Sequence, residues 1–261
     1  MNTRTGLYPN LIAFNTIIRK EVSRFMRIWS QTILPPSITM SLYFIIFGKF
    51  IGSQINLIDG FSYIQYIVPG LIMMSIMTSS YANTASSFFL SKFNRSIEEM
   101  LVAPMPNYII LLGFTLGGAL RGLMVGAIVT LVSFLFTHMP FQHPGIICIM
   151  ALLSAMVLSL GGFINGIYAK RFDDISFIPT FVLTPLTYLG GVFYSIQQLP
   201  PTWRAISVFN PVFNMVDTFR YGFLGMSDMN IYFGLTLVIV LFFILFAWAL
   251  LLLYRGVGIK V

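Results

Sequence analysis

The chain has 261 residues, of which 57% are hydrophobic and 9% charged, with a mean hydropathy of +0.86. This composition excludes a soluble domain and predicts an integral membrane protein with a single domain over residues 1–261. The formal net charge of +7 would suit nucleic acid, but the basic residues are distributed as in a membrane protein, so no nucleic-acid partner is expected.

Residues 1–30 have the pattern of an amphipathic helix. Apolar side chains recur at spacings of three and four, and cations occupy the opposite face. The apolar set is Leu11, Phe14, Ile18, Val22, Phe25 and Trp29, and the cations are Arg19, Lys20, Arg24 and Arg27. Such a helix lies in the membrane interface, where its cations contact anionic lipid headgroups.

The rest of the chain has room for about six hydrophobic spans of roughly 20 residues. They are expected at 33–51, 63–89, 108–136, 145–168, 177–194 and 231–254. The first opens with Pro35 and Pro36, and the fifth is broken by Pro179 and Pro185. The sequence therefore predicts an all-α membrane protein.

The third span combines small residues with one charge. Gly118, Gly122 and Gly126 follow one another at intervals of four, which leaves one face smooth enough for close helix contact. Arg121 lies among them. A guanidinium at membrane depth costs about 2.5–3.5 kcal/mol, so Arg121 is expected to face the bundle interior and to have a partner.

Residues 91–106 form the most polar internal stretch. Ser96 and Glu99 match a capping box, which would start a short helix. Pro104 and Pro106 would stop it. A short helix lying across the membrane surface is therefore expected between the second and third spans.

Residues 196–229 are too rich in proline to span a bilayer and too apolar for an ordinary loop. Two short helices are expected here, dipping back into the outer leaflet between spans five and six. Asp217 and Arg220 have the i, i+3 spacing of a helical pair. We predict that this region covers the outer end of a path through the membrane. The residues assigned to this outer gate are Gly190, Gly191, Pro200, Asp217 and Arg220.

The positions of Lys and Arg predict the orientation. Eleven of the 15 fall on the side of both termini, which makes that side cytoplasmic. These are Arg4, Arg19, Lys20, Arg24, Arg27, Lys92, Arg95, Lys170, Arg171, Arg255 and Lys260, whereas Lys49, Arg204 and Arg220 fall outside and Arg121 lies within a span.

These features resemble the permease subunit of ABC-2 type transporters. The motif that carries the resemblance is Pro185, Tyr188 to Tyr194, Leu199-Pro200, Trp203, Asn210-Pro211 and Arg220. Ser195 departs from it, because many members have proline there. The resemblance implies a homodimer in the bacterial inner membrane that exports drugs, lipids or glycans. It also implies a separate ATPase subunit that meets the short helix through Ile97, Glu98, Glu99 and Leu101.

The sequence has no G-x-x-x-x-G-K-[ST] loop, so ATP is expected on the partner and no cofactor on this chain. His138 and His143 lack a third ligand nearby, so no metal site is expected. No catalytic motif is present either. An ion- or proton-coupled carrier and an intramembrane enzyme remain the alternative functions.

Overall fold

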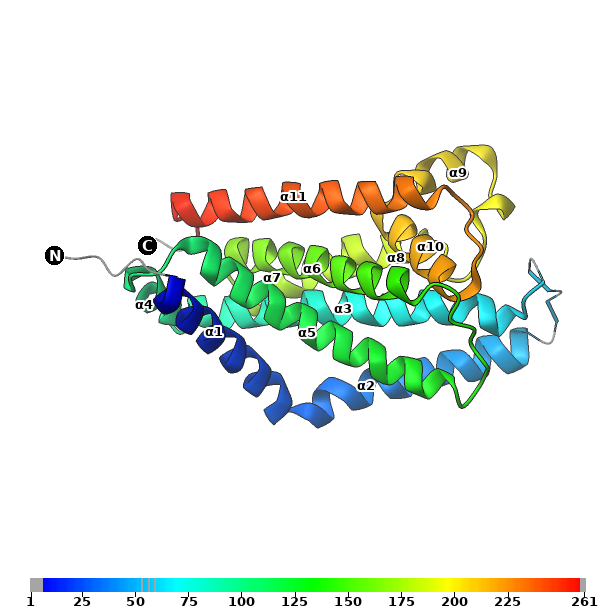
Figure 1. The fold of residues 1–261 in the computed structure, drawn as a ribbon, viewed down its shortest axis with the longest axis horizontal. Coiled ribbons are helices and arrows are strands. Elements are labelled where there is room, and N and C mark those ends of the chain that lie inside the picture. The colour runs from blue at the N-terminus through cyan, green and yellow to red at the C-terminus, as the bar shows by residue number, and fades with distance from the viewer. Residues whose placement is uncertain (1–6, 53, 56, 59, 259–261) are drawn as a thin grey trace.

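The structure is a computed structural model that describes residues 7–52, 54–55, 57–58 and 60–258. Long helices run along its longest axis, and the two termini lie toward the same end (Figure 1). Arg4 and Lys260, which were counted toward the orientation, lie outside the described residues. The described residues contain helices and one isolated bridge pair, which confirms the all-α class for this part of the chain.

The elements follow one another with short connections. In chain order they are α1 (Leu7–Arg27), α2 (Trp29–Tyr43), the π-helix η1 (Phe44–Ile51), α3 (Tyr63–Phe93), α4 (Ser96–Val102), α5 (Asn107–Ser133), α6 (Pro144–Tyr168), α7 (Phe172–Ile178), the π-helix η2 (Pro179–Leu183), α8 (Thr184–Tyr188), the short η3 (Ile196–Gln198), α9 (Pro201–Val208), α10 (Pro211–Leu224) and α11 (Ile231–Arg255).

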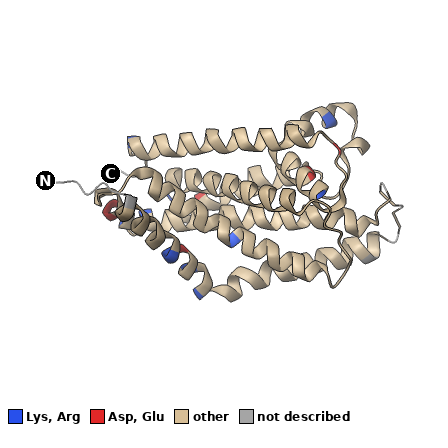
Figure 2. Ribbon diagram, viewed as in Figure 1, with Lys and Arg blue, Asp and Glu red and all other residues tan. Residues whose placement is uncertain are grey.

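Four helical segments of the described residues are long and apolar enough to cross a membrane, namely Trp29–Gly48, Asn107–Ser133, Pro144–Tyr168 and Ile231–Arg255. The helix α3 is longer than any of them, with 31 residues, but its serines, threonines and Asn83 lower its hydropathy. The fifth predicted span is divided among α7, η2 and α8. Some charged residues lie toward the ends of the bundle, and others lie along α1 and midway along the long helices (Figure 2).

The amphipathic N-terminal helix ends at Arg27, and the single residue Ile28 separates it from α2. The expectation that the first span opens at Pro35 is wrong, because α2 already begins at Trp29 and holds both prolines inside it. The hydroxyl of Ser37 donates to the carbonyl of Ile33, 2.8 Å away, within this stretch.

One face of α1 is covered by protein rather than by the membrane interface. Ile17, Glu21 and Phe25 are its buried residues, whereas Leu11 of the predicted apolar stripe is 61% exposed. A side chain in place of Gly117 on α5 would meet Cβ of Glu21 at 2.6 Å. Because Gly117 has no side chain, α1 can approach α5 closely. Hydrophobic periodicity alone did not predict this contact between α1 and α5.

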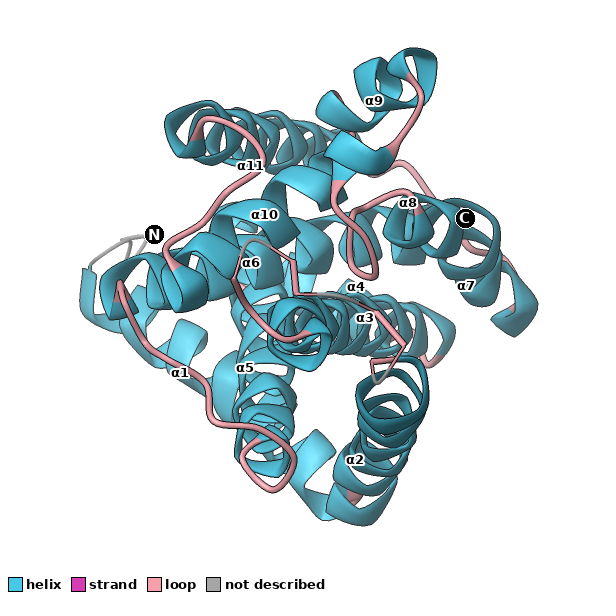
Figure 3. Cartoon of the chain, turned by 90° about the vertical axis from the view of Figure 1, so that its right-hand side faces the viewer, coloured by secondary structure: helices cyan, strands magenta, loops and turns pink. Residues whose placement is uncertain are grey.

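The helix α3 lies at the centre of the bundle and contacts α5, α6, α10, η1, α4 and α7 (Figure 3). Gly118 on α5 faces the hydroxyls of Thr84 and Ser159, and Gly122 faces Ser80. A side chain at Gly162 on α6 would meet a carbonyl of α3. The predicted close contact along the glycine face is therefore confirmed, with hydroxyl-bearing residues on α3 as the opposing surface.

The segment expected as the fifth span is continuously helical from Phe172 to Tyr188; Pro179 begins its π-helical stretch, and Pro185 lies in α8. The hydroxyl of Thr184 donates to the carbonyl of Pro179 at 2.9 Å. This side chain helps to satisfy backbone that proline perturbs, as a membrane requires. The segment then ends at Gly190 and Gly191, and Gly191 has a φ of +64°.

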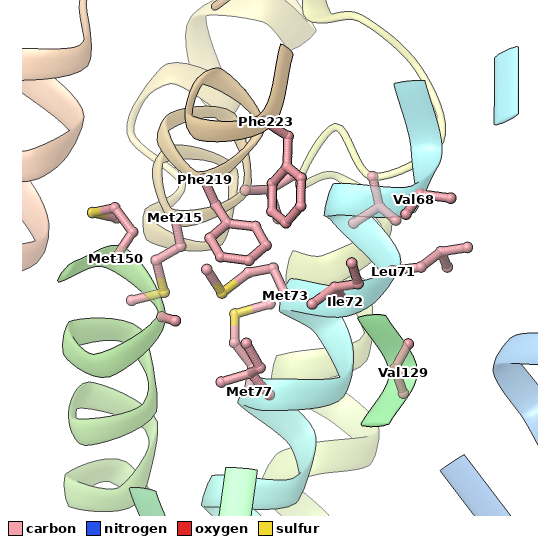
Figure 4. Packing of buried hydrophobic residues seen from close by; sticks show 14 of the residues in the cluster. Val68, Leu71, Ile72, Met73, Met77, Val129, Met150, Met215, Phe219 and Phe223 are labelled. Carbon is pink, nitrogen blue, oxygen red and sulfur yellow. The ribbon is translucent and has the colours of Figure 1, made fainter. Parts of the chain in front are cut away.

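Two short helices, α9 and α10, follow as the sequence predicts, and they lie at the opposite end of the bundle from the termini (Figure 1). The helix α10 is buried on all sides: Met215, Phe219 and Phe223 pack toward Met73 and Met77 of α3 (Figure 4). The helix α9 is peripheral, and its Trp203 is 50% exposed.

The glycine contact predicts a specific loss of stability. Gly122→Ala places a methyl group against Ser80, and overpacking of this kind costs about 1–3 kcal/mol. The melting temperature of the purified protein in detergent should therefore fall by several degrees. Gly145→Ala is the matched control, because no atom lies within 4 Å of the added methyl group. Equal melting temperatures for the two variants would contradict the packing described here.

Candidate functional site

The outer-gate residues of the prediction form part of a buried polar network on α10. Asn210 caps this helix by accepting a hydrogen bond from the amide of Val212 at 2.9 Å. The capped helix places Asp217 and Arg220 one turn apart, with Oδ1 of Asp217 and Nη1 of Arg220 at 3.9 Å. Both side chains are buried, that of Arg220 to 1% exposure.

Arg220 ties three segments together. Its Nε donates to the carbonyl of Tyr66 on α3 at 3.2 Å, and its Nη2 donates to the carbonyl of Gly191. The guanidinium also lies over the ring of Tyr66, 3.9 Å from the centroid. Two nitrogens of this buried cation donate to carbonyls, and the third, Nη1, has no hydrogen-bond partner among the described residues and faces the carboxylate of Asp217. Together with the aromatic contact, these interactions hold α10 against α3 and against the turn at Gly190 and Gly191, which we call the glycine turn.

Asp217 binds the chain that leads into α11. Its carboxylate accepts hydrogen bonds from the hydroxyl of Ser227 at 2.6 Å, the amide of Asp228 at 3.0 Å and the amide of Met229 at 3.2 Å. Asp228 in turn accepts from the hydroxyl of Ser195 at 2.7 Å. Ser195, where the sequence departs from the family motif, is thus part of the network.

The network includes residues that sequence reasoning missed, above all Tyr66, Ser195 and Asp228. Only spacing within one helix was available from the sequence, and these three residues lie outside α10. Of the remaining gate residues, Gly190 packs against Val212. Pro200 precedes α9 and is exposed, so it lies apart from the network.

The predicted coupling helix exists as α4, at the end of the bundle where the termini lie (Figure 1). Glu98 and Glu99 are exposed, as is Val102 at 87%. Ile97, however, is 1% exposed and packs in the core with residues of α1, α3 and α5. Leu101 is partly buried against the same cluster. The expectation that an apolar ridge of α4 faces a partner is wrong for Ile97, because the bundle itself covers it.

The predicted capping box is not formed. Arg95, not Ser96, precedes the first turn of α4, and it has a φ of +58° with no side-chain cap. The hydroxyl of Ser96 instead donates to the carbonyl of Ser91 at 3.1 Å, which closes the turn after α3. The S-x-x-E pattern is frequent by chance, so it identified a short helix here without identifying its start.

Arg121 has its expected partner in Asn83 of α3, whose Oδ1 lies 3.3 Å from Nη1. The same oxygen accepts a hydrogen bond from Arg24 at 2.7 Å. Arg24 lies 3.4 Å from Glu21, and Glu21 accepts from Ser87 at 2.6 Å. The carboxylate of Glu21 is fully buried. The sequence analysis assigned no role to Glu21, because hydrophobic patterning does not show which helix lies against it.

No group of three or more His, Cys, Asp or Glu side chains within the described ranges could hold a metal ion. His143 stacks on Tyr221, with ring centroids 4.8 Å apart, and its amide donates to the carbonyl of Gly222 at 2.8 Å. This histidine therefore contributes to packing between the start of α6 and α10.

The burial of Arg220 predicts that it is needed for stability. Arg220→Ala leaves Asp217 without its cation and two carbonyls without a donor, a loss of about 3–5 kcal/mol. Thermal unfolding in detergent should show a large decrease in melting temperature. Arg204→Ala removes an exposed arginine at the same end and should leave the melting temperature unchanged. A melting temperature for Arg220→Ala close to that of Arg204→Ala would contradict the structural role.

Comparison with known proteins agrees with the resemblance seen in the sequence. The family model of the ABC-2 type transporter matches residues 12–224. The inner membrane transport permease YadH of Escherichia coli strain K12 is 54% identical over 253 residues, which cover 95% of this chain and 97% of that protein. Nodulation protein J of Rhizobium leguminosarum bv. viciae is 26% identical over 196 residues, 73% of this chain and 74% of its own. The chain therefore belongs to the ABC-2 type transporter membrane family and is a multi-pass transport permease.

Proposed function

We propose that the chain is the membrane subunit of an ATP-driven exporter, with ATP bound and hydrolysed by a separate ATPase. The observation that carries this proposal is the placement of α4, whose exposed acids Glu98 and Glu99 lie at the end of the molecule where the termini lie. Family membership supports it, and so does the similarity to a transport permease.

In this arrangement about six spans cross the inner membrane. Four of the spans are the apolar segments found by length and hydropathy. The other two are the helix α3 and the α7–α8 segment. Both termini and α4 face the cytoplasm, and α9 and α10 lie in the outer leaflet. The positive-inside bias of the sequence supports this orientation.

Two copies would enclose the translocation path between them. The segments Trp29–Gly48 and Ile231–Arg255 are each only 17% buried over their most apolar windows, against 67% for α5. These faces are available to lipid or to a second copy of the chain. The substrate class that fits such a path is an amphiphile, such as a lipid, a lipid-linked glycan or a drug.

The bonding of the buried acids favours an ATP-driven exporter over a proton-coupled carrier. Asp217 accepts three hydrogen bonds and lies beside Arg220. Glu21 accepts one from Ser87 and lies beside Arg24. Each buried carboxylate is thus engaged in holding helices together, whereas a carrier requires an acid that exchanges protons during transport.

The proposed coupling role is tested by reversing a charge on α4. Glu99→Arg should weaken ATPase association by about tenfold or more, because a complementary pair becomes a repulsive one. Copurification with the native ATPase, together with transport in vesicles, measures the effect. Gln198→Arg, an exposed position at the other end of the molecule, is the control. Wild-type ATPase content and transport for Glu99→Arg would remove the main mechanical support for this function.

The proposed orientation is tested by single cysteines in a Cys148→Ala background. Positions 94 and 173 should resist a membrane-impermeant maleimide in intact cells, whereas positions 138 and 198 should react. All four side chains are exposed, so each should react once the membrane is permeabilised. Labelling of position 94 or 173 from outside would overturn this topology.

A further inference from the structure

A second site lies beside α4, where α3 ends. A pocket of about 290 Å³ opens there between the end of α3, the α3–α4 turn, the α6–α7 connection and Gly258. Three cations line it, namely Lys92, Arg95 and Lys170, together with one acid, Glu98. A pocket with this excess of positive charge is suited to an anion.

One of the cations fixes the pocket wall. Nζ of Lys92 donates to the carbonyl of Ile167, in the last turn of α6, at 2.6 Å and to that of the cap residue Ala169 at 2.5 Å. The backbone amide of Lys170 donates to Asp174 at 2.8 Å. These bonds hold the α6–α7 connection against the end of α3, so that the walls of the pocket are preformed.

The other two cations form no such bonds, although the carboxylate of Asp174 interacts electrostatically with Lys170. The side chains of Arg95 and Lys170 make no hydrogen bond and no salt bridge with any of the residues that the structure describes. Arg95 is also the one described residue other than glycine with a positive φ, +58°. A left-handed conformation costs a non-glycine residue of order 1–2 kcal/mol, and such residues concentrate at ligand-binding positions.

The rim of the pocket is aromatic. The ring of Phe172 lies 4.9 Å from that of Phe89 and 5.7 Å from that of Phe93, between centroids. Phe93 is 64% exposed and Phe172 54% exposed. Phe89 and Phe93 also line the pocket itself. An exposed apolar rim next to free cations matches a ligand that carries both an anionic head and an apolar body.

We infer that this pocket binds the phosphate of an anionic phospholipid from the cytoplasmic leaflet, with its acyl chains against Phe93 and Phe172. Basic pockets between membrane helices on the cytoplasmic side hold lipid headgroups in this way. An acidic side chain of the ATPase would use the cations but not the exposed rings, so the lipid fits the whole pocket better. The leaflet named here rests on the proposed function, but the lipid contact itself does not.

The test compares lipid retention by purified full-length protein. The variant Arg95→Gln/Lys170→Gln is incubated with phosphatidylglycerol or phosphatidylcholine, and native mass spectrometry counts the lipids retained. Each cation near a headgroup is worth several-fold in affinity, so phosphatidylglycerol binding should fall by about tenfold or more. Binding of phosphatidylcholine should change less than twofold, and an excess of inorganic phosphate should displace little lipid.

The matched control is Arg19→Gln/Arg255→Gln, which removes two exposed cations outside the pocket, one on α1 and one at the end of α11. An equal decrease in both variants would mean general surface attraction and would overturn the site. Full retention of phosphatidylglycerol by Arg95→Gln/Lys170→Gln would also overturn the site. If that variant lost the ATPase but kept its lipid, the occupant would be protein. Arg95→Gly, which removes the cation and suits the positive φ, provides the same readout if the glutamine variant folds poorly.

Discussion

The close approach of α5 and α6 to α3 is the contact on which the rest of the bundle depends. In a membrane, apolar side chains gain nothing by leaving lipid for another helix, so association relies on tight packing and on interhelical polar contacts. Gly118 and Gly122 supply the space, and the hydroxyls of Thr84 and Ser80 fill it. Part of the polar character of α3 therefore has a role in helix packing.

The same constraint governs the buried charges. A membrane-embedded ion is stable only when partners replace its water. Arg220 receives two carbonyls, the carboxylate of Asp217 and an aromatic ring. Glu21 is buried where α1 crosses α5, and it is reached by Arg24 and Ser87. Each cluster joins helices that are distant in sequence, so each contributes to specifying one arrangement of the bundle.

Hydropathy, charge bias and glycine spacing predicted much of the fold, because each reports a property of a single helix in lipid. The all-α class, α4, α9, α10 and the glycine face of α5 followed from such signals. The burial of Ile97 and Glu21 did not, because burial depends on which helix lies alongside. Amphipathic patterning gives the direction of the polar face but not whether water or protein covers it.

The sequence predicted the pair on α10 and the involvement of Gly190 and Gly191, but not the other partners of the candidate site. The i, i+3 spacing predicted that Asp217 and Arg220 are close, and they are. The partners that complete the network come from α3, from the glycine turn and from the chain before α11. No local pattern marks Tyr66 or Ser195 for this role, because the carbonyl and hydroxyl they supply are common to many residues. Contacts across the bundle require the fold to be known.

The helix α3 joins the two ends of the molecule at which the candidate sites lie. It contains 31 residues, which correspond to about 46 Å. Near one end, the carbonyl and ring of Tyr66 hold Arg220, and Gly70 packs against Val192 beside the glycine turn. At the other end, Lys92 holds the end of α6, and the turn at Arg95 leads directly into α4. Because α3 is helical from Tyr63 to Phe93, with Pro69 inside it, a displacement of α4 would reach the Arg220 network along α3. The glycine contacts that fix α3 between α5 and α6 would then determine whether those helices move with it as one body.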